Sequence, residues 1–368
     1  MTNSHDVVIV GAGPVGAAAA RELSRVGRRV LLIDPGSKPG EAWRASAGML
    51  APQIETREDT PLFELGVAGR EYYRDRAAEL ADETGINIGL VESGILRLAV
   101  TEADDSLLRS AVAWQRQHGQ RADWLDPDEV RSEFPWVGRN RGALWAPQDG
   151  AVDPVRLVEA LRASAIRSGT RFVTDTITSL VRQGGRITGV ESEHASYAAG
   201  EVVLAAGAWT GRLSGLPRPV SVEPVRGQMI AKPWPKHIPP AIVYGAHGYV
   251  LERAGEALCG ATVEHAGFTV ETTASGEQEV AGIADELIPV LGSAPVTRRW
   301  AGLRPGTPDG LPIFGAEPEA PNLWYATGYG RNGILFAGIT GIALTHLMAR
   351  EATFDGVRAL SPGRFWSW

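Results

Sequence analysis

The 368-residue sequence predicts a mixed α/β fold with two interleaved domains, one built on a parallel sheet and one on a mainly antiparallel sheet. Three observations predict this fold class. A short apolar strand, a glycine-rich turn and an alanine-rich helix open the chain, alternating apolar and polar residues dominate the stretch after residue 220, and a glycine-rich turn leads into an apolar helix near the C-terminus. Because the first and last patterns are of one kind, we expect the material between them to be inserted.

The elements follow in order from local patterns. Continuous apolar runs predict parallel strands buried on both faces, at 6–10 and 29–34. Helical periodicity covers four segments: 15–26, 61–83, 105–119 and 153–169. The third is closed by Gly119, and the fourth begins with Asp153 as N-cap and Pro154 at its first position.

The remaining segments are expected to be strands and one buried helix. A strand is predicted at 93–100, a strand pair is predicted from TRFVTD (170–175) and GRITGVESE (185–193), and GEVVLAAGAWTG (200–211) is predicted to be a strand ending in a glycine turn. Alternation predicts antiparallel sheet over 220–297. The apolar stretch 333–349 contains Gly, Thr and His, so it predicts a buried helix rather than a membrane span.

Composition excludes several classes of function. The formal net charge is −7 and there is no basic stripe, which argues against a nucleic-acid partner. The single cysteine, Cys259, allows no intramolecular disulfide and no multi-cysteine metal site, so we expect no metal. The N-terminus lacks the pattern of a signal peptide, and a cytoplasmic location is expected. A homo-oligomer remains open.

The segment VGAGPVG (10–16) predicts a dinucleotide-binding, Rossmann-type domain. Its glycines have the G-x-G-x-x-G spacing, which permits a tight turn, close approach to a pyrophosphate and helix-on-strand packing. Asp34 follows at a strand end, where a carboxylate holds ribose hydroxyls and disfavours a 2′-phosphate. NAD or FAD is therefore favoured over NADP. The loop residues expected to contact the cofactor are Gly11, Gly13, Pro14, Val15 and Gly16.

Later segments resemble a flavoprotein family. The small-residue run WRASAGMLAPQ (43–53), EVVLAAGAWTG (201–211) and LWYATGYGRNGILFAGITG (323–341) resemble, in this order, segments of the D-amino-acid-oxidase superfamily. The phrases SAGML (46–50), WAGLRPGTPDG (300–310) and GYGRNGIL (328–335) are similar to its glycine-oxidase branch. The likeness runs over nearly the whole chain.

The resemblance implies non-covalent FAD, because no histidine stands near residues 45–46 and Cys259 lies outside the C-terminal flavin loop. It implies an FAD-binding domain over 1–85, 145–220 and 299–368, and a substrate-binding domain over 86–144 and 221–298. Beyond the glycine loop and Asp34, the implied cofactor residues are Arg44, Ala45, Ser46, Ala47, Gly48, Met49, Ile177, Ala206, Gly207, Trp209, Gly328, Gly330, Arg331, Asn332, Gly333 and Ile334.

The resemblance also implies a substrate site. Arg304 would bind the substrate carboxylate and Tyr249 would assist it; the alternatives are an internal salt bridge to Asp309 and a plain core tyrosine. Arg331 would lie near flavin and substrate, or would only brace a loop.

Three further residues are expected around this site. His247, two residues from Tyr249 and expected on the same strand face, would act on O₂ or the substrate amine, or would be a surface-loop histidine. Met49 and Val263 would line the pocket. Val263 stands where glycine oxidase has methionine, which reshapes the pocket.

The implied reaction is oxidation of glycine or an N-substituted glycine, such as sarcosine or an N-carboxymethyl amine. A hydride leaves the α-carbon for flavin N5, the imine is hydrolysed, and O₂ becomes H₂O₂. Such chemistry needs alignment more than proton transfer, which fits the lack of a Ser/His/Asp or paired-carboxylate motif. Three alternatives remain: a flavin dehydrogenase serving a quinone or partner protein, a D-amino-acid oxidase, and a flavin-bound protein without redox activity.

Overall fold

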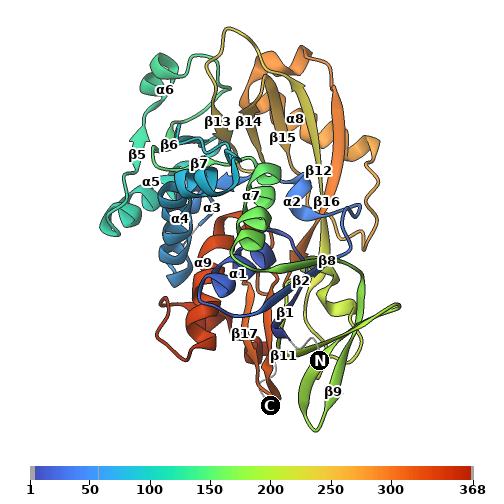
Figure 1. Cartoon of the computed structure of the whole chain (residues 1–368). Helices are drawn as coiled ribbons and strands as arrows, with labels where there is room; N and C mark the ends of the chain where they lie inside the picture. Colours follow the sequence, from blue (N-terminus) through green and yellow to red (C-terminus); the bar gives the residue numbers. More distant parts are fainter. Residues whose placement is uncertain (1–4, 57, 366–368) are drawn as a thin grey trace.

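Two eight-stranded sheets organise the chain (Figure 1). The computed structural model describes residues 5–56 and 58–365. In the first sheet the main strand order is β17-β18-β11-β1-β2-β8, and β10 and β9 extend from β11. Its strands are β1 (His5–Val10), β2 (Val30–Asp34), β8 (Arg171–Thr174), β9 (Ile177–Gln183), β10 (Arg186–Ser192), β11 (Ser196–Leu204), β17 (Ile313–Glu317) and β18 (Ala320–Thr327).

The core of this sheet is parallel and buried on both faces, as its apolar strands predict. Strands β8, β2, β1, β11 and β18 run parallel to one another. In β1, Val7 and Ile9 pack in the cluster formed with the helices, whereas Val8 and Val10 pack on the opposite face with residues of β9 and β10. The helices on the first face are α1 (Pro14–Arg25), α4 (Pro61–Thr84), α7 (Pro154–Arg167) and α9 (Gly333–Met348).

The glycine loop between β1 and α1 leaves no room for side chains at two of its positions. Gly11 has φ +100°, and a Cβ there would lie 2.5 Å from the carbonyl oxygen of Ala205. A Cβ on Gly16 would lie 1.9 Å from the carbonyl oxygen of Gly11. The spacing of these glycines therefore lets α1 start directly against the sheet.

The second sheet has the order β16-β12-β15-β14-β13-β4-β6-β5. Its strands are β4 (Ile95–Leu98), β5 (Asp123–Leu125), β6 (Ala143–Ala146), β12 (Glu223–Pro233), β13 (Ile242–Tyr244), β14 (Tyr249–Arg253), β15 (Glu256–Gly260) and β16 (Arg298–Gly306). Apart from the parallel pair β4–β13, neighbouring strands are antiparallel. The sheet lies above the first one in Figure 1.

Short elements complete the structure. A two-stranded ribbon pairs β3 (Met49–Leu50) with β7 (Gly150–Ala151). The other helices are α2 (Ala42–Ala45), α3 (Pro52–Glu55), α5 (Glu102–Gln117), α6 (Pro127–Glu133) and α8 (Ala274–Leu287), and the 3₁₀ turns are η1 (Gly207–Arg212), η2 (Pro289–Ser293), η3 (Val357–Leu360) and η4 (Pro362–Phe365). Helix α8 packs on one face of the second sheet, through Val280, Ile283 and Leu287.

Most predicted elements are confirmed. The Asp153 carboxylate caps α7 by accepting hydrogen bonds from the N–H groups of Val155 (2.9 Å) and Arg156 (3.1 Å). Gly119 follows α5 with φ +73°. Helix α9 is buried over most of its length, and no helix within 5–56 and 58–365 is long and apolar enough to cross a membrane.

Two predictions were wrong. Segments 170–175 and 185–193 do not pair with each other: β8 joins β2 in the parallel sheet, and β10 pairs with β9 and β11. The stretch 220–297 is not sheet throughout, because it contains α8. The signal for this helix is local: Thr273 accepts a hydrogen bond from the N–H of Gly276, and buried Val280, Ile283, Ala284 and Leu287 recur at helical spacing.

The predicted domain division cuts the second sheet at two points. The boundary at residue 145 falls inside β6 (Ala143–Ala146), which pairs with β4 and β5. The boundary at residue 299 falls inside β16, which pairs with β12 over nine residue pairs at the edge of the second sheet. Residues 299–306 are thus structurally part of that sheet. The division into FAD-binding and substrate-binding parts otherwise stays a prediction.

Candidate active site

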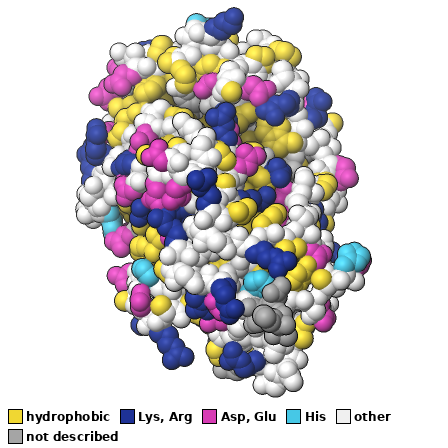
Figure 2. Space-filling view, viewed as in Figure 1, with side chains coloured by type: hydrophobic (Ala, Val, Ile, Leu, Met, Phe, Trp, Pro, Cys, Tyr) yellow, Lys and Arg dark blue, Asp and Glu magenta, His cyan; other side chains and the backbone are white. Residues whose placement is uncertain are grey.

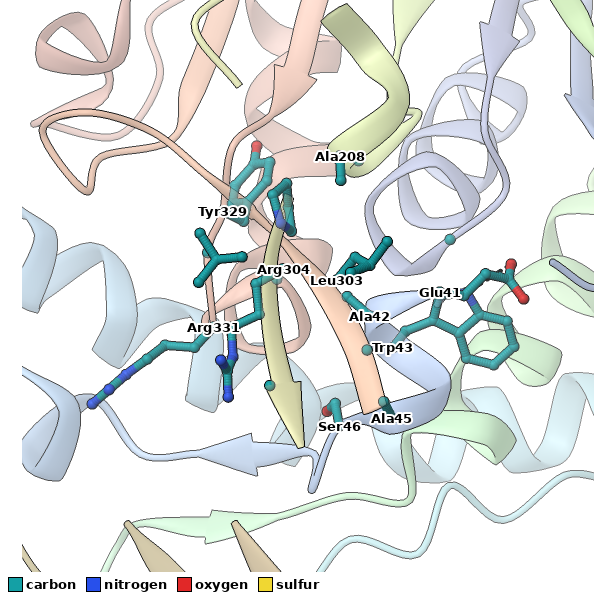
Figure 3. A pocket seen from close by; sticks show the side chains of 18 of the residues that line it. Glu41, Ala42, Trp43, Ala45, Ser46, Ala208, Leu303, Arg304, Tyr329 and Arg331 are labelled. Carbon is teal, nitrogen blue, oxygen red and sulfur yellow. Dashed lines mark hydrogen bonds between the residues drawn. The ribbon is translucent and has the colours of Figure 1, made fainter. Parts of the chain in front are cut away.

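A cavity of about 1100 Å³ is lined by residues of both sheets. It extends from the glycine loop after β1 to Arg304 on β16, and Figure 3 shows part of its lining. On the face of the molecule seen in Figure 2, basic side chains are interspersed with acidic ones, so this face has no patch of a single sign. The cavity lined by both sheets is therefore the candidate site.

The glycine-loop end of the cavity has a fixed carboxylate. Asp34 Oδ2 accepts a hydrogen bond from the Ala12 N–H at 2.7 Å, and Oδ1 accepts one from the Gly36 N–H at 2.9 Å. These bonds hold the Asp34 carboxylate at the C-terminal end of β2, where it lines the cavity. This placement agrees with the predicted contact to ribose hydroxyls, which stays a prediction.

The long helices α1 and α9 begin at the cavity. Gly13, Pro14 and Val15 of the α1 N-terminus line it, and so do Asn332 and Gly333 at the start of α9. Neither N-cap, Gly13 or Asn332, makes a side-chain capping hydrogen bond, and neither first turn contains an acidic residue. Two helix N-termini with their positive dipole ends are thus presented to an anionic ligand.

These features fit FAD. A Cβ on Gly13 would have its nearest neighbour 3.6 Å away on the Trp43 ring, so the loop leaves space for a pyrophosphate above α1. The residues at 45–48 offer a wall of small side chains, and Ile177 lines the cavity as Asp34 does. The same cavity continues from the glycine loop to the arginine on β16.

The structure brings nearly all predicted cofactor residues to the cavity. Those that line it are Gly11, Gly13, Pro14, Val15, Asp34, Ala45, Ser46, Ala47, Gly48, Met49, Ile177, Ala206, Gly207, Trp209, Gly330, Arg331, Asn332, Gly333 and Ile334.

Three predicted cofactor residues lie outside the lining. Gly16 packs under the loop against Gly11, and Gly328 adopts φ +74° against Thr307. Arg44 is exposed; its guanidinium pairs with Glu41 at 2.6 Å and lies over the Trp43 ring. Gly16 and Gly328 therefore allow close packing of the backbone. The Arg44 side chain contacts Glu41 and Trp43 and does not line the cavity.

Arg304 points into the other end of the cavity (Figure 3). Its guanidinium lies against Gly227 of β12, where a Cβ would come within 2.4 Å of Nη2. Nη1 donates to the Thr262 carbonyl at 2.9 Å, and within the described chain no carboxylate lies within 4.0 Å of the Arg304 guanidinium. The alternative partner, Asp309, pairs instead with Arg364 at 2.8 Å.

Burial shapes the chemistry around Arg304. Desolvation lowers the pKa of Arg304 from its ordinary value, which means that its charge is under-compensated in the fold. An anionic ligand would remove this imbalance. The planar guanidinium offers a carboxylate two parallel donors.

Tyr249 begins β14 and lines the same end of the cavity. Its hydroxyl contacts Met229 Sδ at 3.7 Å, which is a weak acceptor, and its ring lies 5.3 Å from that of Tyr244. Burial raises the pKa of Tyr249 to about 12, so its phenol stays protonated at neutral pH. It is thus available as a neutral hydrogen-bond donor to a ligand.

Arg331 has a partner that the sequence did not indicate. Its guanidinium forms an ion pair with Glu55 of α3, and the Tyr244 hydroxyl donates to the other oxygen of Glu55. The Glu55 charge raises the pKa of Arg331 above its ordinary value. Arg331 therefore both lines the cavity and braces a loop. Glu55 stands two residues after the small-residue run 43–53, and that position was its only sequence signal.

His247 does not lie on the strand face of Tyr249, so that prediction was wrong. It lies exposed in the connection between β13 and β14, because β14 starts only at Tyr249, and it lines the cavity from there. Met49 and Val263 line the cavity as predicted, and Val263 is 67% exposed. Cys259 is fully buried in the cluster under α8, on the opposite side of the sheet from Tyr249.

Comparison with known proteins agrees with this cavity. The sequence pattern of the family described as "FAD dependent oxidoreductase" matches residues 6–347. A glycine oxidase of Geobacillus kaustophilus is 34% identical over 362 residues, covering 96% of each chain.

Two solved structures extend the comparison. The crystal structure of glycine oxidase from Geobacillus kaustophilus has a TM-score of 0.92 at 32% identity, covering 99% of both chains. An iminodiacetate oxidase from Chelativorans sp. BNC1 has a TM-score of 0.85 at 27% identity, covering 97% of this chain and 98% of that one.

Proposed function

This chain belongs to the family of FAD-dependent oxidoreductases, and on that premise we propose that it oxidises glycine or an N-substituted glycine, such as sarcosine or an N-carboxymethyl amine. The observation that carries this proposal is Arg304. It lies on the cavity wall with one hydrogen bond, to Thr262, and with no carboxylate partner in the described structure. A substrate carboxylate supplies that partner.

The residues around Arg304 suit a small amino acid. The guanidinium binds the carboxylate in a bidentate manner, and the neutral Tyr249 hydroxyl donates a further hydrogen bond. Both groups orient the α-carbon and hold the amine in a fixed place. Orientation of this kind contributes to rate without any proton transfer by the protein.

When bound, FAD would supply the acceptor for a hydride from the substrate α-carbon. The residues of this chain that would hold FAD are the glycine loop, Asp34, the small residues 45–49 and the first turn of α9. The positive end of the α9 dipole favours negative charge at its N-terminus, next to Gly333. No covalent attachment is proposed, because Cys259 is buried away from the cavity.

We take O₂ as the electron acceptor and H₂O₂ as the product, with the cytoplasm as location. The rival is a dehydrogenase that passes electrons to a quinone or a partner protein. The H₂O₂ yield per turnover in air decides between them: about one equivalent supports the oxidase, and negligible H₂O₂ with rapid reduction of a dye supports the dehydrogenase.

The test of the substrate class is anaerobic mixing of the FAD-loaded protein with a panel of amino acids. Glycine, sarcosine and N-alkylglycines should bleach the yellow flavin, and D-alanine and D-proline should do so more slowly. Faster bleaching by the D-amino acids would make the protein a D-amino-acid oxidase. Bleaching by none of them would refute the proposed substrate class.

A further inference from the structure

Opposite charges meet at the substrate end of the cavity. Arg304 and Arg331 both line it, and Glu55 is the acidic residue that lines it next to them. The Glu55 side chain is only 7% exposed, and its carboxylate is shared between Arg331 and the Tyr244 hydroxyl. In Figure 3 the side chain of Arg331 extends away from that of Arg304. The Arg331 charge is thus compensated by a carboxylate of the protein, whereas Arg304 has no carboxylate partner within the described residues.

The backbone next to Glu55 is anchored by Asp149 and Arg97. The N–H groups of Gln53 and Ile54, its neighbours in α3, donate to Asp149 Oδ2 at 3.0 and 3.2 Å. Arg97, which also lines the cavity, donates to the Ile54 carbonyl at 2.7 Å. Asp149 is completely buried. The position of Glu55 is therefore built into the fold and does not depend on a mobile side chain alone.

We propose that Glu55 is a specificity-determining residue that restricts the substrate to one carboxylate and to an N-substituent without negative charge. This inference rests on the proposed function and deepens it. The carboxylate of Glu55 neutralises Arg331 and leaves Arg304 to bind the substrate carboxylate. A second carboxylate on the N-substituent of the substrate meets an arginine that is already paired and a carboxylate of like charge.

The substrate class that follows is glycine and N-alkyl or N-carbamoylalkyl glycines. Iminodiacetate, a dicarboxylate of the same length as the shortest N-carbamoylalkyl glycine, is disfavoured as a substrate. Its monoamide, N-(carbamoylmethyl)glycine, has nearly the same shape and differs by one negative charge. The pair thus isolates the charge of the substituent from its size.

The test uses binding as well as turnover. Diglycolate and its monoamide contain an ether oxygen in place of the amine, so they are not amino acids and can serve as unreactive probes. Their Kd values are measured by calorimetry on the FAD-loaded wild type and on Glu55→Gln, which keeps the length and hydrogen bonding of the side chain. The ratio of the diglycolate Kd to the monoamide Kd should fall roughly tenfold or more in Glu55→Gln, because Arg331 is then unpaired.

Two control variants sharpen this result. Glu133→Gln removes one negative charge from an exposed position at the end of α6 and should leave the Kd ratio unchanged. The double variant Glu55→Gln with Arg331→Gln restores the local net charge and should return the ratio toward that of the wild type. An unchanged ratio in Glu55→Gln, or an equal shift in Glu133→Gln, overturns the proposal.

Turnover separates this inference from the proposed function. The kcat/KM of iminodiacetate relative to its monoamide should rise in Glu55→Gln in parallel with the binding ratio. If the Kd ratio shifts as expected but none of these amines bleaches the flavin, the charge selection stands and the oxidase proposal falls. If the wild type oxidises glycine and handles iminodiacetate and its monoamide equally, the oxidase proposal stands and the role of Glu55 falls.

Discussion

Two arginines of this chain, Arg70 and Arg304, are placed in opposite ways. Arg70 of α4 is 3% exposed, and its guanidinium donates to Asp149 at 2.8 Å, Gln53 at 2.9 Å and Gln120 at 2.7 Å. Arg304 donates to one carbonyl, that of Thr262, and otherwise faces the cavity. One guanidinium is satisfied by the fold, and the other is left to a ligand.

The difference teaches how a structural cation and a binding cation can be told apart. A charge removed from water needs a partner, and a fold that lacks one at that point has to obtain it from outside. Arg70 closes a network that joins α4 to the start of α3 and the loop before β7. Arg304 carries the same guanidinium group but has no such network. Breaking the Arg70 network should therefore lower the free energy of unfolding, whereas replacing Arg304 should lower kcat/KM.

The largest effect is expected for Arg304→Ala. Loss of the partner of a buried carboxylate costs about 3–5 kcal/mol, which is roughly two to three and a half decades in kcat/KM. FAD content and the free energy of unfolding should change little, because Arg304 makes one internal hydrogen bond. Steady-state kinetics with sarcosine or glycine measures the loss.

Arg304→Lys is the matched control for this variant. It keeps the charge but offers no planar pair of donors, so its kcat/KM should lie between those of the alanine variant and the wild type. An alanine variant with wild-type kcat/KM would show that Arg304 does not bind the carboxylate.

Asp149→Asn should have the next largest effect, on stability. It removes the buried carboxylate partner of Arg70 and leaves only the partly exposed Glu71 to compensate that charge, which costs about 3–5 kcal/mol in the free energy of unfolding. Urea unfolding of the FAD-loaded protein measures this loss. A smaller loss than that of Arg304→Ala under the same conditions would reverse the assignment of the two arginines.

Gly227→Ala tests the placement of Arg304 without altering its charge. The added methyl would lie 2.4–2.5 Å from the guanidinium, so the side chain has to move and KM should rise by roughly tenfold, with kcat less affected. Gly282→Ala is the matched control, because a Cβ on that glycine of α8 meets no atom within 4 Å. Equal KM values in the two variants would argue against a fixed position of Arg304.

Val263→Met should have the smallest effect. Val263 is largely exposed and lines the cavity, so a longer side chain narrows the space beside the substrate. The kcat/KM of N-alkylglycines relative to glycine should fall by a few-fold, which is less than the roughly tenfold or more of one methylene in a buried pocket, because Val263 is largely exposed. An equal change across a series from glycine to N-butylglycine would contradict a role in substrate size.

The sequence by itself determined the elements whose signals are local. The glycine loop, the N-cap Asp153 and the apolar helix α9 each depend on residues within one or two turns, and the structure confirms all three. Local signals were also present for α8, at Thr273 and the apolar residues after it. The alternating pattern of the residues before it led us to predict sheet over the whole stretch. Family resemblance, rather than spacing, pointed to Arg304, Tyr249 and Arg331.

Only the tertiary structure decided which residues meet. Arg331 and Glu55 are 276 positions apart in sequence, and Arg70 and Asp149 are 79 apart. Arg304 lies over Gly227 because the antiparallel register of β12 and β16 aligns Val225 with Arg304, which puts Gly227 on the same face two residues along. Sequence patterns act over a few residues, whereas strand register and helix packing bring distant charges together, and those contacts decide which arginine stays open to a substrate.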